Sequence, residues 1–333
     1  MYYSLLLLLI GFAILIKGAD FLVNGASSAA KRYGISNLAI GLTVVAFGTS
    51  MPELIVSLLS ALEGKNDASF GNVIGSNNFN LLFILGISGL IYPLVVQRNT
   101  VKFEVPLSLL AVFVLYFTVN DVMLWGDSSI APAWGGVLSR FDGIVLLVFF
   151  GIFLLYIYRT MKQTSDLDQD GSVKIYSMPM SIGMVIVGLA MLIGGGELVV
   201  DNAIDIAHYF GLSEKLIGLT ILAAGTSLPE LATSAVAAYK KNTDIAIGNV
   251  VGSNIFNIFF ILGITAIVHP IEYNASMNFD LYVLVGSTLL LMVFMFTLNT
   301  HKLDRWEAFL MLAAYIVYTL YLVANDPGAP VTQ

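Results

Sequence analysis

The chain consists of long apolar runs separated by short polar stretches. A run of about 20 apolar residues is long enough to cross a bilayer as a helix. Ten such runs follow one another, so the pattern predicts an all-α membrane protein with ten transmembrane helices. The approximate spans are 3–30, 36–62, 69–92, 103–119, 141–160, 178–208, 213–239, 245–268, 278–298 and 306–324.

Composition agrees with a membrane location. Hydrophobic residues make up 58% of the 333 residues and charged residues only 11%, with a mean hydropathy of +0.87. A soluble domain carries about 25% charged residues, so much of this surface must face lipid. There are no cysteines, which excludes disulfides, thiolate metal sites and cysteine nucleophiles.

The Lys and Arg residues lie mainly on one side of this arrangement. Eleven of them lie near the loops after the first, third, fifth, seventh and ninth runs, whereas three lie near the loops on the other side. Because cytoplasmic loops are enriched in Lys and Arg, both termini are expected outside the cytoplasm, in the cell membrane. The three exceptions are Lys65, Arg140 and Lys215.

The longest polar stretch divides the chain into two halves of five helices each. We expect a first five-helix repeat at 1–160, a cytoplasmic linker at 161–177 and a second repeat at 178–333. Five is an odd number, so the second half enters the membrane with the opposite orientation. Inverted halves of this kind are typical of secondary transporters.

The two halves also share sequence. Residues 41–86 begin GLTVVAFGTSMPEL and contain GNVIGSNNFN, while residues 218–263 begin GLTILAAGTSLPEL and contain GNVVGSNIFN. A constant offset of 177 aligns them without a gap, and 25 of the 46 positions are identical. The matches include Gly, Thr, Ser, Pro, Glu and Asn, so they indicate a duplicated site and not merely shared hydrophobicity.

Each half carries Gly-Thr-Ser-x-Pro-Glu inside an apolar run. Proline removes a backbone donor and clashes with the preceding turn, so we expect helix breaks at Gly48–Pro52 and Gly225–Pro229. Helices 3 and 8, which carry the second motif, are expected to be broken as well. Free carbonyls in lipid need another partner, and a bound cation is one candidate. The carbonyls concerned are those of Ala46, Thr49, Ala223 and Thr226.

Glu53 and Glu230 follow the two predicted breaks. A charged group in mid-membrane costs at least about 2.5–3.5 kcal/mol, so this pair needs a compensating ligand. The second motif adds a Ser and an Asn four residues apart, which places both side chains on one helical face. An oxygen-rich set without His or Cys favours hard cations such as Ca²⁺. The added residues are Ser76, Asn80, Ser253 and Asn257.

The paired motifs resemble the repeats of the cation/calcium exchanger superfamily, specifically the prokaryotic-type sodium/calcium exchangers. The resemblance implies a secondary active antiporter that exchanges Na⁺ for Ca²⁺ by alternating access at a midplane site, with helices 1 and 6 sliding across the others. It implies a monomer in the lipid bilayer, with no enzymatic activity, no cofactor, no nucleic acid and no protein partner.

The resemblance also implies roles for individual residues. Glu53 and Glu230 would bind Ca²⁺ with the carbonyls of Thr49 and Thr226. One flanking Na⁺ site would use Ala46, Thr49, Ser50, Ser253 and Glu230, and its mirror would use Ala223, Thr226, Ser227, Ser76 and Glu53; Asn80 and Asn257 would line the centre.

One position departs from a pattern found in some relatives. Potassium-dependent exchangers carry Asp where this chain has Asn257. The amide lowers the local negative charge by one, which argues against potassium dependence.

Three other functions remain as alternatives. Proton/calcium exchange could use the same carboxylates, although related proton exchangers usually carry Gly-Asn-x-x-Glu in place of the motif found here. A cation channel would need weak, successive sites along a continuous pore. An intramembrane enzyme is disfavoured, because the glutamate pair resembles no aspartyl dyad.

Two further groups of acidic residues have competing interpretations. Asp20 and Glu197 occupy matching positions in the two halves, and they either line an ion path or tie helices together. In the linker, Asp166, Asp168 and Asp170 match the opening of a calcium-binding EF-hand loop. The closing position is Ser177 and not the Glu that such a loop needs, which favours a solvated linker.

Overall fold

The computed structural model describes residues 2–120, 134–160, 174–210, 223–297 and 301–324, which are nearly all helical. Within these described residues, eight helical spans are long and apolar enough to cross a membrane, or nine when the bent pair Asn37–Thr49 and Met51–Leu62 counts as one. The predicted run at 213–239 begins outside the described residues. The acidic stretch of the linker, from Asp166 to Asp170, also lies outside them.

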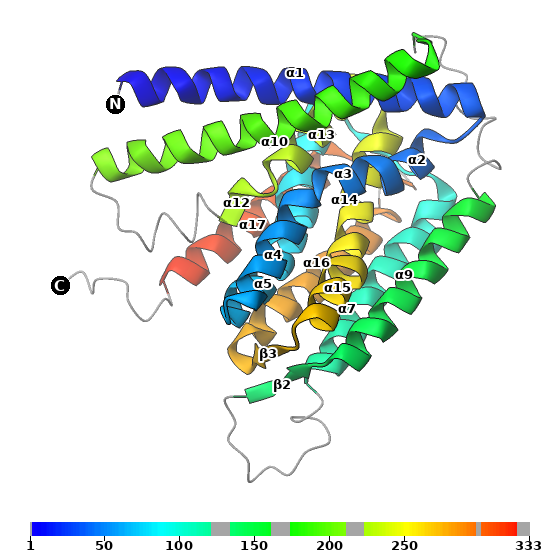
Figure 1. The fold of residues 1–333 in the computed structure, drawn as a ribbon. Coiled ribbons are helices and arrows are strands. Elements are labelled where there is room, and N and C mark those ends of the chain that lie inside the picture. The colour runs from blue at the N-terminus through cyan, green and yellow to red at the C-terminus, as the bar shows by residue number, and fades with distance from the viewer. Residues whose placement is uncertain (1, 121–133, 161–173, 211–222, 298–300, 325–333) are drawn as a thin grey trace.

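Where the structure describes them, the predicted runs coincide with helices (Figure 1). In the first half these are α1 (Tyr2–Tyr33), α2 (Asn37–Ile40), α3 (Ala46–Thr49), α4 (Met51–Leu62), α5 (Asn66–Asn78), α6 (Leu85–Ile91), α7 (Val105–Val119) and α9 (Arg140–Thr160). In the second half they are α10 (Met178–Tyr209), α12 (Ala223–Gly225), α13 (Leu228–Tyr239), α14 (Thr243–Ile255), α15 (Gly263–Val268), α16 (Asn278–Phe294) and α17 (Arg305–Ala324).

Short irregular helical segments complete these spans. A 3₁₀ turn, η6 (Ala275–Met277), precedes α16. The others are π-helical: η1 (Gly41–Val45), η2 (Phe79–Ile84), η3 (Thr100–Glu104) and η5 (Phe256–Leu262).

The sequence repeat reappears as a repeat of structure. Shifting α4 by 177 positions gives the bounds of α13, and shifting α5 gives those of α14. The spans that contain α5 and α14 are the most buried: 72% and 83% of the residues in their most apolar stretches are inside, against 17% for α17. The repeated segments therefore form the centre of the protein, and α17 lies at its periphery.

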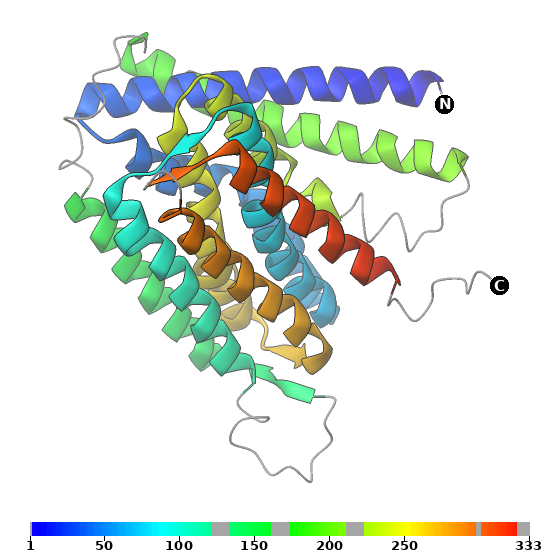
Figure 2. The same ribbon diagram turned by 180° about the vertical axis from the view of Figure 1, so that it is seen from behind.

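Helices α1 and α10 form a separate antiparallel pair that crosses one end of the bundle (Figures 1 and 2). They approach closely because Gly18 faces Gly188. A Cβ added to Gly18 would lie 2.9 Å from the Gly188 carbonyl oxygen. Small residues allow this kind of backbone contact between membrane helices. Ser28 and Ser181 add a hydrogen bond of 2.8 Å between their hydroxyls.

The expectation that helices 3 and 8 are broken is wrong. The spans Asn66–Ile91 and Thr243–Val268 are each continuous, and they contain the π-helical segments η2 and η5. Neither span contains proline, so every residue keeps its backbone N–H. The helix therefore stays continuous and only widens into a π-helical turn. Such π-helical turns are frequent at functional sites.

Two short antiparallel sheets were not predicted. In one, β1 (Leu94–Val95) pairs with β4 (Lys302–Leu303). In the other, β2 (Trp134–Leu138) pairs with β3 (Ile271–Asn274). Each sheet joins a loop of the first half to a loop of the second.

Candidate ion-binding site

The predicted break in the second run lies at Ser50. Helices α3 and α4 meet there at a bend of 46°, and Pro52 occupies the first turn of α4. Proline has no backbone N–H, and the first turn of a helix tolerates this because N–H groups there have no helical acceptor. In the second half, Thr226 and Ser227 separate α12 from α13. Each break therefore begins a new helix close to the predicted site.

These two helices place a carboxylate in the protein interior. Glu53 lies in the first turn of α4 and Glu230 in the first turn of α13, where the helix dipole favours negative charge. Each glutamate is only 1% exposed. Both side chains therefore lie inside the protein and away from lipid.

The serine of each half lies beside the carboxylate of the other half. Ser50 Oγ is 2.9 Å from Glu230 Oε1, and Ser227 Oγ is 3.0 Å from Glu53 Oε1. Ser50 and Glu53 are separated by only two residues on the chain. The crossed contacts therefore bring both carboxylates into one cluster.

The serines of the second motif complete two matching groups of oxygens. Ser253 Oγ lies 3.0 Å from Ser50 Oγ and 3.4 Å from Glu230 Oε1. In the mirror group, Ser76 Oγ lies 2.9 Å from Ser227 Oγ. Each group thus combines one carboxylate with two hydroxyls, contributed by both halves of the chain.

Asn80 and Asn257 lie in the π-helical segments η2 and η5. Their amide nitrogens donate across the repeat boundary, from Asn80 to Asn254 Oδ1 at 3.0 Å and from Asn257 to Asn77 Oδ1 at 2.9 Å. Sequence reasoning did not single out Asn77 and Asn254. Both are identical at the offset of 177, so the repeat carried the signal.

Four buried oxygens of this cluster have no hydrogen-bond partner among the residues that the structure describes. They belong to the two glutamates and the two asparagines, and each half contributes two of them. A buried acceptor without a partner costs about 1–3 kcal/mol, and more when it is charged. Each of them is an oxygen of the kind that a bound Ca²⁺ takes as a ligand. The atoms are Glu53 Oε2, Glu230 Oε2, Asn80 Oδ1 and Asn257 Oδ1.

Two further asparagines hold the breaks in place. Thr49 Oγ1 donates to Asn249 Oδ1 at 3.1 Å, and Thr226 Oγ1 donates to Asn72 Oδ1 at 3.2 Å. The Asn249 amide also reaches the Glu230 carbonyl at 3.3 Å. Asn72 and Asn249 were also missed, although the repeated Gly-Asn in each half marks them.

The expectation of free carbonyls does not hold at Ala46. Its oxygen accepts from the Ser50 backbone N–H at 3.0 Å and lies 3.3 Å from Thr49 Oγ1. Helical hydrogen bonding therefore continues up to the bend at Ser50. Ala223, the predicted mirror, is the first residue of α12.

A cavity of about 980 Å³ reaches the site from one side. It lies between α4 and α5 on one wall and α10 on the other, and it extends to the contact between Asn72 and Thr226. Glu197, one of the two acidic residues with competing interpretations, lines it together with Asp201. Asn72, which lines the cavity, donates to the Glu53 carbonyl at 3.1 Å, so the cavity is the candidate path by which water and ions approach Glu53.

A buried oxygen-lined site assembled from two repeats of a helical membrane protein is typical of ion transporters. Comparison with known proteins supplies the family. The sodium/calcium exchanger protein family matches residues 3–159 and 180–324. The chain belongs to this family. It is a multi-pass membrane protein of a cation/calcium antiporter class, and it is not an enzyme.

Relatives and a solved structure cover most of the chain. Inner membrane protein YrbG of Escherichia coli is 38% identical over 80% of both chains. Sodium/calcium exchanger MaX1 of Methanosarcina acetivorans is 30% identical over 96% of this chain and 98% of its own. The sodium-calcium exchanger NCX_Mj has a similar fold, with a TM-score of 0.78 and 33% identity, over 96% of this chain and 98% of its own.

Proposed function

We propose that the protein exchanges Na⁺ for Ca²⁺ across the cell membrane by alternating access to one site. The observation that supports this most directly is the set of four buried oxygens without partners, two from each half. A carboxylate and an amide from each half are ligands that Ca²⁺ accepts. The relationship to sodium/calcium exchangers supports the same conclusion.

The proposed ligands follow the two observed groups of oxygens. Ca²⁺ binds between Glu53 and Glu230 with the carbonyls of Thr49 and Thr226. Na⁺ binds on either side, beside the hydroxyls that flank each carboxylate. These flanking sites use Ala46, Thr49, Ser50, Ser253 and Glu230 on one side and Ala223, Thr226, Ser227, Ser76 and Glu53 on the other, with Asn80 and Asn257 between them. For Na⁺ to bind there, the Ala46 carbonyl exchanges its contact with the Thr49 hydroxyl for the ion.

Charge balance explains why the two ions exclude each other. Two carboxylates neutralise one Ca²⁺ or two Na⁺, but they cannot neutralise both loads together. Mutual exclusion at one site is what coupled exchange requires. A channel would conduct without a counter-ion.

We also infer ten transmembrane helices in two inverted halves, 1–160 and 178–333, joined by a cytoplasmic linker. The excess of Lys and Arg near one set of loops supports this orientation, with both termini outside the cytoplasm. One chain contributes both halves of the site, so a monomer suffices for transport.

Sodium is the proposed counter-ion for a structural reason. Two hydroxyls accompany each carboxylate, at distances of 2.9–3.4 Å in the Ser50, Ser253 and Glu230 group. Neutral oxygens of this kind are ligands for Na⁺, whereas a proton needs only the carboxylate. The Gly-Thr-Ser-x-Pro-Glu motif that supplies Ser50 and Ser227 agrees with this choice.

Reconstituted vesicles test the proposal. Vesicles loaded with Na⁺ are diluted into Na⁺-free buffer that contains ⁴⁵Ca²⁺, with pH held equal on both sides. We expect Ca²⁺ uptake that depends on internal Na⁺ and stops when the Na⁺ gradient is collapsed. Uptake that follows an imposed pH gradient and ignores Na⁺ would assign proton exchange. Uptake that needs neither gradient would assign a channel.

A further inference from the structure

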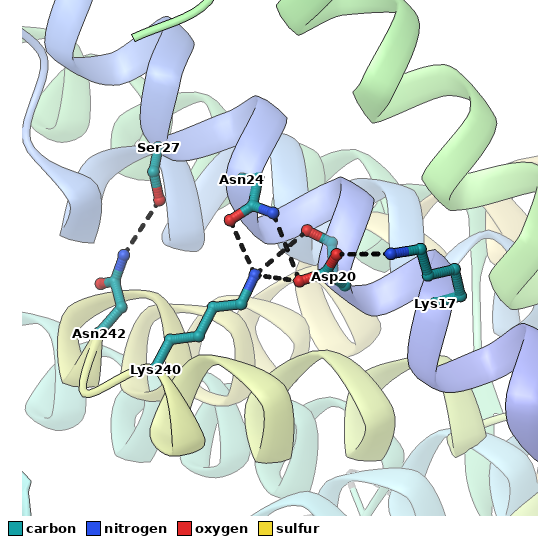
Figure 3. A network of polar contacts seen from close by, with 6 residues as sticks. All are labelled: Lys17, Asp20, Asn24, Ser27, Lys240 and Asn242. Carbon is teal, nitrogen blue, oxygen red and sulfur yellow. Dashed lines mark hydrogen bonds and ion pairs between the residues drawn. The ribbon is translucent and has the colours of Figure 1, made fainter. Parts of the chain in front are cut away.

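Asp20 connects α1 to the end of a helix that carries one of the site carboxylates (Figure 3). Its carboxylate forms an ion pair with Lys240, the residue that follows α13. The Lys240 ammonium also donates to Asn24 Oδ1 at 2.7 Å. One turn further along α1, the amide of Asn242 donates to Ser27 Oγ at 3.0 Å. This network of five side chains joins α1 to the end of α13.

The Asp20–Lys240 pair is half-buried, with 30% of the Asp20 side chain and 27% of the Lys240 side chain exposed. Water screens it only in part, so it is stronger than an ordinary surface pair. Helix α13 carries Glu230 in its first turn and ends at Tyr239. At 1.5 Å per residue, about 15 Å separate Glu230 from Lys240 along the helix axis. A shift of α1 along α13 must break the pair.

The mirror positions cannot form such a pair. At the offset of 177, Asp20 corresponds to Glu197, Lys240 to Glu63 and Asn24 to Asp201. All three mirror residues are acidic, so α10 and the end of α4 would repel each other there. Glu63 instead pairs with Lys65 of its own loop at 2.7 Å.

The packing differs in the same way. Helix α1 packs directly on α13. Between their counterparts α10 and α4 lies the 980 Å³ cavity, which Glu197 and Asp201 line. The structure is therefore closed where the two halves carry opposite charges and open where they carry like charges.

We propose that the Asp20–Lys240 ion pair holds α1 against α13, and that it favours the state open between α4 and α10 over the state open between α1 and α13. The proposal rests on alternating access in the proposed function. It assigns Asp20 and Lys240 to the equilibrium between the two states and not to ion binding. Removing the pair shifts that equilibrium toward the opposite opening.

Because the sequence contains no cysteine, a single introduced cysteine can report which side of the protein is open. Val56 lines the open cavity, and its counterpart at the offset of 177, Thr233, is fully buried. A Thr233→Cys variant reacts with a hydrophilic maleimide only when the closed side opens. Its labelling rate in detergent solution therefore follows the population of the minor state. A Val56→Cys variant reports on the side that is already open.

We expect Lys240→Met or Asp20→Asn to raise the Thr233→Cys labelling rate by about two- to tenfold, and to slow Val56→Cys labelling or leave it within twofold. Lys240→Arg, which keeps the charge, is expected to label like the parent. Lys17→Met is the matched control, because Lys17 contacts the same Asp20 at 3.3 Å but belongs to α1 itself. It cannot tie two helices together, so its rate should stay at the parent value.

An unchanged rate in Lys240→Met, or an equal rise in Lys17→Met, would overturn the proposal. A rise in labelling at both Val56→Cys and Thr233→Cys would also overturn it, since that result indicates general loosening. Labelling requires no ion flux. An unchanged rate therefore rejects the role of the ion pair alone, whereas loss of Na⁺-dependent uptake in the unmodified protein rejects the exchange function.

Discussion

The two halves of the site have nearly the same chemistry but different access. The Thr226–Asn72 contact of 3.2 Å lies on the cavity wall. Its mirror, the Thr49–Asn249 contact of 3.1 Å, is buried. The residues in the two contacts are identical, so they cannot determine which side is open. Access must depend on residues outside the repeated motifs, where the halves differ.

The differences between the halves are concentrated at the ends of the repeated helices. The end of α4 carries Glu63, whereas the end of α13 carries Lys240. The starts of the same two helices carry the identical Pro and Glu of the motif. A duplicated chain can thus retain two matching ligand groups while one pair of helix ends sets the preferred opening.

The largest expected effect comes from the carboxylates. Glu53→Gln or Glu230→Gln removes one of the two negative charges that balance Ca²⁺, and we expect Na⁺-dependent ⁴⁵Ca²⁺ uptake to fall by roughly 100-fold or more. Because the two groups of oxygens match, the two losses should be similar in size. Coupled exchange retained in both variants would refute the site.

Glu63→Gln is the matched control for this experiment. Glu63 is exposed and pairs only with Lys65 among the described residues. The change removes the same charge from the residue that follows the same helix, without touching the site. Because it also weakens the repulsion between α4 and α10, uptake should change only modestly, far less than 100-fold.

A smaller effect is expected at the central amides. Asn257→Asp adds a negative charge beside a cluster that already contains two, so we expect the apparent Ca²⁺ affinity to change by about tenfold with little loss of folded protein. Asn80→Asp should change it in the same direction, because both amides make mirror contacts of 2.9–3.0 Å. Unchanged Na⁺ and Ca²⁺ dependence in both variants would place these residues away from the ions.

The sequence predicted most of the described helices because they depend on local signals. The apolar runs mark the spans, and Pro52 marks the bend observed at Ser50. The repeat also brought Ser50 and Glu230 together correctly, since an internal duplication implies crossed contacts.

The remaining features depend on packing that a linear pattern does not encode. The π-helical turn around Asn80 forms without any proline to mark it. The Asp20–Lys240 pair joins residues 220 positions apart. The sequence left Asp20 with two interpretations, an ion path or a tie between helices. The structure favours the tie for Asp20 and places its counterpart Glu197 on the cavity wall.

The smallest expected effect is a difference in stability between variants of the two motif threonines, Thr49 and Thr226. Thr49→Val leaves Asn249 Oδ1 buried without a donor, which costs about 1–3 kcal/mol of unfolding free energy. Thr226→Val leaves Asn72 at the cavity wall, where water can replace the hydroxyl. We therefore expect thermal unfolding in detergent to show a larger loss of stability for Thr49→Val than for Thr226→Val.

Thr43→Val controls for loss of a threonine hydroxyl. Thr43 Oγ1 donates to the Ala39 carbonyl at 2.7 Å within the same helical span, and its side chain is only partly buried. The contact is local and lies within one helical span, so the variant should unfold close to the parent temperature. Equal losses for Thr49→Val and Thr226→Val would mean that water does not reach Asn72. In that case the two halves would be alike in solvation as well as in chemistry, and the cavity could not be the path to Glu53.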